Sequence, residues 1–200
     1  MNSQKISVRR SKIILDRICQ CDIFKNIDII ENINIKDSKL IINKIVFPYV
    51  ICLNQECDLE NDYKENSNHN NIEQLKDKCF LHIAIAPLFI FDQFLEGKHW
   101  GEILTSNPIP KGKKGNIGTK IKSIIDNEVP RYHYLNFPNS ETELPKELII
   151  DFKHFFTINR NFLYKNINKR VCSIDDLFRE KISQRFSNYI SRIGLPEYIE

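Results

Sequence analysis

The sequence lacks several features that would place it in a membrane, secreted or metal-binding class. No apolar stretch approaches the roughly 20 residues of a membrane-spanning helix, and charged residues interrupt the N-terminal segment where a signal peptide would have its apolar core. The six cysteines form no C-x-x-C pair, and the five histidines show no H-x-x-x-H spacing. Both patterns are typical of zinc sites. We therefore expect a cytoplasmic protein with buried, reduced thiols, no metal or other cofactor, and no membrane association.

A strong excess of one charge is also missing. The chain of 200 residues has 29 basic and 26 acidic side chains, and its formal net charge of +3 permits nucleic-acid binding without arguing for it. Hydrophobic residues make up 42% and charged residues 28%, which are ordinary values for a globular protein and exclude global disorder. The length is that of one domain, so we expect residues 1–200 to fold as a single domain with its own core.

Apolar spacing predicts a mainly β fold with helices, of the α+β class. Alternating β-branched and aromatic residues indicate short strands, and apolar residues three to four positions apart indicate helices. The expected helices lie at about 7–20 and 174–193, with a short one at 88–104. The expected strands lie at 23–35, 46–53, 79–87, 131–137, 147–152, 155–158 and 170–173. The polar stretch 54–78 is predicted to be an exposed loop, and 108–118 a mobile basic loop.

Short strands without regular strand–helix alternation favour a small, bent antiparallel sheet or barrel over a doubly wound sheet. The barrel would occupy about 21–173, with loop or helix insertions at about 54–78 and 88–129. The C-terminal helix would pack on the barrel through apolar residues that recur at every fourth position. Ser173 is the candidate for the N-cap of that helix.

The order of these segments resembles that of the MazF/PemK-like toxins, which are small SH3-like barrels. The matching pieces are Cys-Asp-Ile-Phe at 21–24, Phe-Pro-Tyr-Val-Ile-Cys-Leu at 47–53, Ala-Ile-Ala-Pro-Leu-Phe at 84–89, Ile-Ile-Asp-Phe at 149–152, Thr-Ile-Asn at 157–159 and Arg-Val-Cys-Ser at 170–173. The resemblance implies an RNA-binding, metal-independent endoribonuclease from a bacterial toxin–antitoxin or antiviral phage-defence system. The partners expected under this interpretation are RNA, a cognate antitoxin or neighbouring defence protein, and a second copy in a homodimer.

Two positions depart from that family. The family uses an Arg just before the strand proline and a Thr after a Pro-Ile pair, and this chain has Phe47 and Phe89 there. A phenylalanine ring neither donates a hydrogen bond to a phosphate nor moves a proton. Two hypotheses therefore stay open. One is an endoribonuclease that uses other residues, and the other is a catalytically silent SH3-like barrel that acts as a protein-interaction subunit of a defence complex.

One polar element follows the strand predicted at 46–53 and could carry chemistry. Gln55, Cys57 and Asp58 place an amide, a thiol and a carboxylate side by side, and the element Gln-x-Cys-Asp-Leu at 55–59 is similar to one in uncharacterised bacterial proteins. As a nucleophile in a cysteine-dependent hydrolase, Cys57 would need a base or a positive charge beside it. The alternative interpretation buries Cys57 in the core and uses Asp58 to cap the loop.

The first candidate partners of Cys57, His133 and Arg131, lie in the strand predicted to begin at Arg131, and His82 in the strand predicted at 79–87 is the second choice. Alternation would place Arg131 and His133 on one face of that strand and Tyr132 and Tyr134 on the other. In the RNA-cleaving hypothesis, His133 is the base or acid, Arg131 stabilises the charged phosphorane, and the Gln-x-Cys-Asp-Leu element lines the same site. The two tyrosines and the glutamine amide of that element would hold the substrate.

The remaining histidines and carboxylates carry weaker signals. Asp151, which His154 follows three residues later, is interpreted as a structural carboxylate at a turn. No role is assigned to His99.

Overall fold

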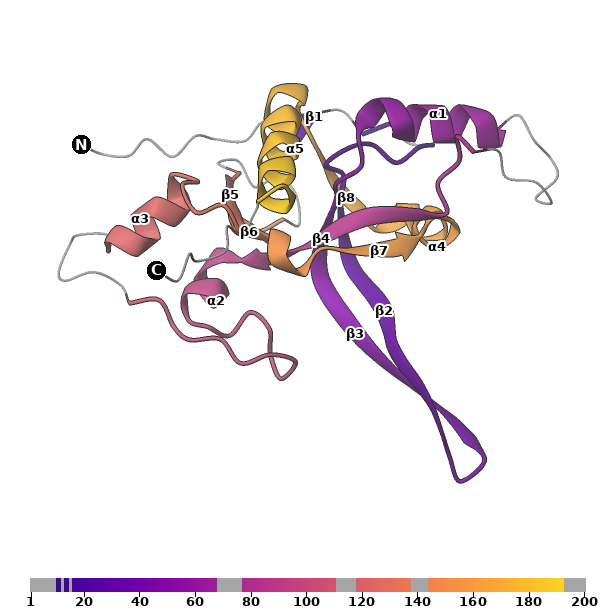
Figure 1. The fold of residues 1–200 in the computed structure, drawn as a ribbon, viewed down its shortest axis with the longest axis horizontal. Coiled ribbons are helices and arrows are strands. Elements are labelled where there is room, and N and C mark those ends of the chain that lie inside the picture. Colours follow the sequence, from indigo (N-terminus) through magenta and orange to yellow (C-terminus); the bar gives the residue numbers. More distant parts are fainter. Residues whose placement is uncertain are drawn as a thin grey trace, which may run out of the picture.

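The computed structural model describes residues 10–11, 13–14, 16–67, 77–110, 118–137 and 144–192. Within these ranges, eight strands form one curled sheet in which all pairs are antiparallel (Figure 1). The strands are β1 (Arg10–Ser11), β2 (Ile23–Lys36), β3 (Lys39–Cys52), β4 (His82–Ile90), β5 (Tyr132–Asn136), β6 (Glu147–Asp151), β7 (Phe156–Asn159) and β8 (Arg170–Ile174). Their order is β1-β8-β2-β3-β4-β6-β5, and β7 also pairs with β4. This bent antiparallel sheet confirms the predicted α+β class, mainly β with helices.

Helices cover both faces of the sheet. They are α1 (Glu56–Ser67), α2 (Phe91–Leu95), α3 (Thr119–Ile125), α4 (Arg160–Lys165) and α5 (Asp176–Ile190). Successive side chains of a strand point to opposite faces, so the strands contribute to two apolar clusters. Ile149 of β6 belongs to the cluster that includes α2 and α3, whereas Leu148 and Ile150 belong to the cluster that includes α5.

The predicted C-terminal helix is confirmed, but it begins later than expected. Ser173 does not cap it, because Ser173 lies in β8 and its hydroxyl donates a hydrogen bond to the carboxylate of Asp22. The N-cap is Asp175, whose carboxylate accepts from the backbone N–H of Leu177 at 3.3 Å. Ile182 on the inner face of α5 is fully buried, which anchors the helix to the sheet.

The helix expected at about 7–20 does not occur in the described part of that segment. Arg10–Ser11 is strand β1, and turns follow it. Arg170 of β8 explains the difference, because its guanidinium donates to the backbone carbonyls of Ile14 and Arg17. These carbonyls therefore accept hydrogen bonds from a distant side chain, whereas in a helix they would accept from backbone N–H groups. The rest of the segment lies outside the described residues.

The stretch 54–78, expected to be an exposed loop, begins with helix α1, and its residues 68–76 lie outside the described ranges. The helix is almost entirely polar and has no apolar stripe to reveal it. Only a few of its side chains reach the body. Leu59 is fully buried, and the buried carboxylate of Asp62 pairs with Arg160 of α4 at 2.7 Å.

The predicted insertion at 88–129 contains less helix in its first part than expected. The helix expected at 88–104 covers only Phe91–Leu95, because β4 continues to Ile90. Most of the predicted basic loop, residues 111–117, lies outside the described part of the chain. In the ranges that are described, no helix is long and apolar enough to cross a membrane.

Strand β2 lies where the sequence predicted a strand at 23–35, whereas β3 begins seven residues earlier than the strand predicted at 46–53. Each has 14 residues, and together they form a hairpin that projects from the body of the protein (Figure 1). Asp37 and Ser38 at its tip both have positive φ, which is the backbone of a tight two-residue hairpin turn. We call residues 28–46 of this hairpin the ribbon. In the described part of the chain, the strands of the ribbon pair only with each other, because β2 pairs with β8 at 23–24 and β3 pairs with β4 at 49–52.

Candidate functional site

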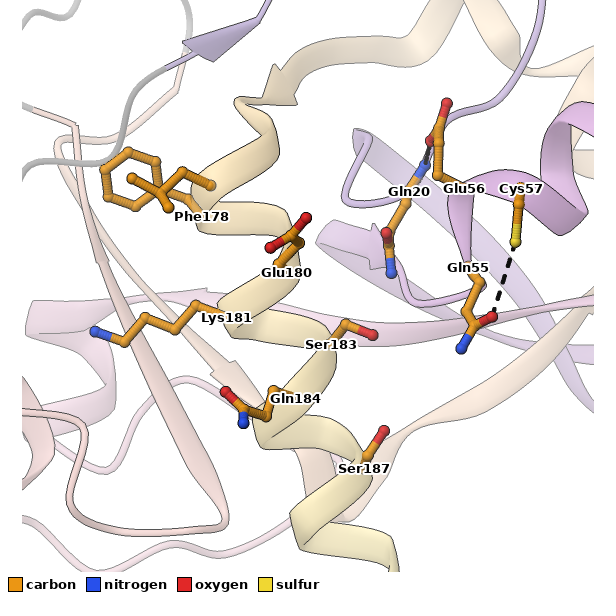
Figure 2. A pocket seen from close by; sticks show the side chains of 11 residues that line it. Gln20, Gln55, Glu56, Cys57, Phe178, Glu180, Lys181, Ser183, Gln184 and Ser187 are labelled. Atoms are coloured by element: carbon orange, nitrogen blue, oxygen red, sulfur yellow. Dashed lines mark hydrogen bonds between the residues drawn. The ribbon is translucent and has the colours of Figure 1, made fainter.

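A cleft of about 940 Å³ opens between the N-terminal end of α1 and one side of α5 (Figure 2). Most of its lining residues are polar, although Leu177 and Phe178 add apolar surface. The residues that line it are Gln20, Gln55, Glu56, Cys57, Leu177, Phe178, Glu180, Lys181, Ser183, Gln184 and Ser187. The Gln-x-Cys-Asp-Leu element therefore lies at a concave surface, where ligand sites commonly occur.

Glu56 fixes the geometry of this cleft. Its carboxylate accepts a hydrogen bond from the backbone N–H of Gln20 at 2.7 Å, and it pairs with Arg17 at 2.7 Å and with Arg179 of α5 at 3.2 Å. These contacts tie the turn before β2, the start of α1 and the start of α5 together. Because two guanidinium groups already neutralise this carboxylate, we interpret Glu56 as a structural residue.

Gln55, Cys57 and Asp58 lie together as the sequence predicted. The Cys57 thiol is 3.7 Å from Asp58 Oδ1 and 3.9 Å from Gln55 Oε1. Both neighbours are acceptors, and none of the described residues that line the cleft is a histidine, so no imidazole activates the thiol there. Cys57 is exposed, which differs from the alternative that packed it in the core.

The other cysteines differ sharply from Cys57. Cys19, Cys21, Cys52 and Cys172 are buried, and Cys79 is half-buried. Burial raises the pKa of Cys19 to about 12 and holds the pKa of the thiols of Cys21 and Cys52 well above its ordinary range. These buried thiols are therefore protonated packing residues, as expected for reduced cysteines in a core.

His133 is remote from solvent. It is the second residue of β5, only 4% of its surface is exposed, and its Nδ1 has no hydrogen-bond partner among the described residues. Burial, together with the positive charges of Arg185 and Lys181 on α5, lowers the pKa of His133 to about 3. A neutral imidazole enclosed in this way does not contact a substrate, and the structure does not bring it into the cleft with Cys57.

Arg131 lies apart from His133. It precedes β5 and turns to Asp151 at the end of β6, where Nε and Nη2 bind the two carboxylate oxygens at 2.8 and 2.6 Å. Its guanidinium also lies 4.8 Å from the centroid of the Tyr132 ring. The predicted sharing of one face by Arg131 and His133 is therefore not observed.

The structure adds a histidine beside Arg131 that sequence reasoning did not assign. His154 Nε2 is 3.9 Å from Asp151 Oδ2, and the His154 ring packs edge-on against Trp100 at 4.6 Å. Burial lowers the pKa of His154, so its imidazole is neutral at pH 7. The three-residue spacing between Asp151 and His154 across a tight turn is the one sequence signal that could have found this pair.

The two tyrosines of β5 pack inward. Tyr132 contacts Phe94 with ring centroids 4.9 Å apart, and Tyr134 contacts Phe91 at 4.8 Å. The Tyr134 hydroxyl donates to Glu147, which together with burial raises the pKa of Tyr134. Neither ring is presented as a stacking surface for a base, and both lie away from the cleft.

Phe47 and Phe89, which stand where the MazF/PemK-like family has its Arg and Thr, are both core residues. Phe47 stacks on Phe156 with ring centroids 5.0 Å apart, and Phe89 lies 4.8 Å from Trp100. Within the described ranges, no three His, Cys, Asp or Glu side chains gather closely enough to hold a metal ion. Comparison of the chain with models of protein families, with curated proteins and with solved structures finds no match.

Proposed function

We propose that this chain is a catalytically silent protein-interaction subunit, whose ribbon docks on another protein. One observation carries the proposal. Six large apolar side chains on the ribbon are exposed by 43–78%. They are Ile30, Ile33, Ile35, Leu40, Ile42 and Val46. Under the MazF/PemK resemblance, such a subunit would belong to a toxin–antitoxin or phage-defence complex.

The exposed apolar surface has a clear energetic consequence. The six side chains present on the order of 600 Å² of apolar surface, which is at the upper limit of the largest patches on typical monomeric proteins. Burial of such surface is favourable by about 25 cal/mol per Å². A projecting hairpin with this surface is therefore better suited to a protein partner than to water.

Three observations at the candidate residues support the absence of catalysis by the family's mechanism. Phe47 and Phe89 fill the core, His133 is enclosed beneath α5, and the Cys57 thiol has only acceptors beside it. All three observations agree with a subunit that has no catalytic activity and acts by binding another protein.

The proposal predicts that complex formation depends on the apolar side of the ribbon. We expect the tagged chain, co-expressed with the untagged products of neighbouring genes and an untagged second copy, to retain a partner during purification. Ile33→Thr with Ile42→Thr should lose it, because these two opposed residues lie in the middle of the apolar surface. Asn34→Thr with Ile41→Thr changes a pair on the opposite face of the same strands and should keep it. Equal retention by all three forms, or purification of all three alone, would contradict the proposal.

A second candidate function is favoured by the pair of Arg131 and His154. Asp151 occupies Nε and Nη2 of Arg131, so Nη1 would bind a phosphate oxygen, and the neutral His154 imidazole would accept a proton from a 2′-hydroxyl. In this candidate the chain is a metal-independent endoribonuclease, and its site contains Arg131 without His133.

The endoribonuclease candidate predicts a specific loss of cleavage. On single-stranded RNA in the presence of a metal chelator, we expect His154→Gln to slow cleavage by about 100-fold or more, the usual contribution of a general base. The matched control is His82→Gln, which changes an exposed histidine on β4. Since the pKa of His154 is lowered, the wild-type rate should rise with pH only below about 6.5 and then level off. Intact RNA at high protein concentration would remove this candidate.

A further inference from the structure

The pairing register of the ribbon places six of its seven exposed large apolar residues on one face, and the seventh, Ile41, lies on the opposite face. Residues directly opposite each other in an antiparallel pair lie on the same face. The opposed pairs on this face are Ile35–Leu40, Ile33–Ile42, Ile30–Lys44 and Asp28–Val46. We call it the apolar face. The opposite face includes Asn32 and Asn43, whose amide groups hydrogen-bond to each other at 2.8 Å.

A β-bulge creates this arrangement. The register shifts between Ile30 and Asn32, so that Glu31 has no partner on β3. Because side chains alternate with a period of two, one additional residue sends every later side chain of β2 to the other face. Ile33 and Ile35 thereby join Ile30 instead of continuing the inner face of β2.

The apolar face is electrically neutral. Its charged side chains are Asp28 and Lys44, which pair with each other at 3.1 Å near the base of the ribbon. A surface that binds RNA would carry unpaired basic groups to contact phosphates. The composition of this face therefore favours an apolar protein surface as its occupant.

We infer that the occupant is the apolar face of a second copy of this chain, packed face to face about a twofold axis. This inference rests on the proposed interaction function and names its partner. A stable specific interface buries about 1,200–2,000 Å² in total, and two apolar faces of on the order of 600 Å² each reach the lower end of that range. Neutral faces of this kind meet without placing an unpaired charge in the interface.

The shape of the ribbon fits the same arrangement. Strand β2 contributes Ile30, Ile33 and Ile35 to the apolar face, and β3 contributes three further apolar residues. About a twofold axis, the apolar residues of β2 and β3 pack against the same residues of the partner copy, as an isologous contact requires. An isolated two-stranded hairpin is marginally stable in water, whereas two stacked hairpins form a two-layered sandwich with an apolar interior.

The mass of the purified full-length chain in solution tests this inference. At about 100 µM, above the micromolar dissociation constants of weak interfaces, we expect light scattering to give twice the monomer mass of 23.7 kDa. Ile33→Thr with Ile42→Thr should give the monomer mass, while Asn34→Thr with Ile41→Thr stays dimeric. Threonine is β-branched, so these changes preserve strand propensity while removing apolar surface.

Hydrogen exchange on the wild-type chain gives the same test without substitutions. Amides at 30–42 should exchange more slowly at high than at low protein concentration. A wild-type monomer at about 100 µM, or a dimer that survives in the Ile33→Thr and Ile42→Thr variant, overturns the second copy as the occupant. If the wild type is monomeric but this variant loses a co-purifying protein that the control keeps, the interaction function stands and only the identity of its partner is wrong.

Discussion

Replacing Asp22 by alanine is expected to lower the free energy of unfolding by about 3–5 kcal/mol, the usual cost of removing one partner of a buried ion pair. Asp22 is fully buried, and the Arg170 side chain is only 2% exposed. The carboxylate accepts from Arg170 Nη1 at 2.6 Å and from the backbone N–H of Cys19 at 2.8 Å. Burial raises the pKa of Asp22, and these contacts oppose that rise. Without the carboxylate, a guanidinium remains inside the protein without its counter-charge.

The matched control for Asp22→Ala is Glu60→Ala. Glu60 pairs with Lys64 one turn later in α1 at 2.7 Å, but both side chains are exposed, and such pairs contribute little to stability. Urea denaturation of the three proteins at pH 7 measures both differences. Similar losses in the two variants would mean that the Asp22–Arg170 pair does not behave as a buried pair.

Acid is expected to destabilise the protein through His133. The pKa of a histidine in an unfolded chain is about 6.5, whereas the pKa of His133 in the folded protein is about 3. Between these values the unfolded state binds a proton that the folded state does not bind. Stability contributed by the neutral imidazole is therefore fully present above about pH 6.5 and falls by about 1.4 kcal/mol per pH unit below it. At pH 4.5 the expected loss is about 2–3 kcal/mol.

A substitution at His133 separates this effect from the rest of the acid response. His133→Leu removes the titrating group and the Nδ1 that has no hydrogen-bond partner among the described residues, so its stability should depend less on pH and should not fall at pH 7. His82→Gln should keep the wild-type dependence, because His82 is exposed. Some slope should remain in His133→Leu, since burial also lowers the pKa of His99 and His154. Urea midpoints at pH 7.0 and 4.5 measure the slopes, and an unchanged slope in His133→Leu would contradict the assignment.

The sequence predicted the parts of the fold that bury one regular face. Alternation located β5, β6 and β8, and the four-residue spacing located α5, because in each case the apolar side chains face the core. The sequence pattern missed α1, because few residues of this helix, such as Leu59, pack against the core. It also predicted a helix near the N-terminus, where Arg170 instead donates hydrogen bonds to the backbone carbonyls of Ile14 and Arg17. Local patterns carry no information about contacts made by distant residues.

The ribbon shows a different limit. Its isoleucines have the pattern of a buried strand, yet Ile35 is 78% exposed. Sequence patterns predict that such residues avoid water, but they do not tell whether the protein's own core or a partner covers them.

The candidate site could be predicted only where its residues are adjacent in sequence. Gln55, Cys57 and Asp58 lie together because one turn carries them. Strand alternation correctly placed His133 and Tyr132 on opposite faces of β5. It did not apply to Arg131, because this residue precedes β5 and its side chain binds Asp151. The pair of Asp151 with Arg131 joins two strands, and no local pattern reports such a pairing.

The position of β8 between β1 and β2 has a consequence for how the chain folds during synthesis. The guanidinium of Arg170 and the carboxylate of Asp22 are separated by 148 residues along the chain. A nascent chain that has not reached 170–174 holds β2 with one unpaired edge and Asp22 without its cation. The N-terminal strands therefore complete their sheet only after residues 170–174 have left the ribosome, and such late, long-range pairing makes folding slow.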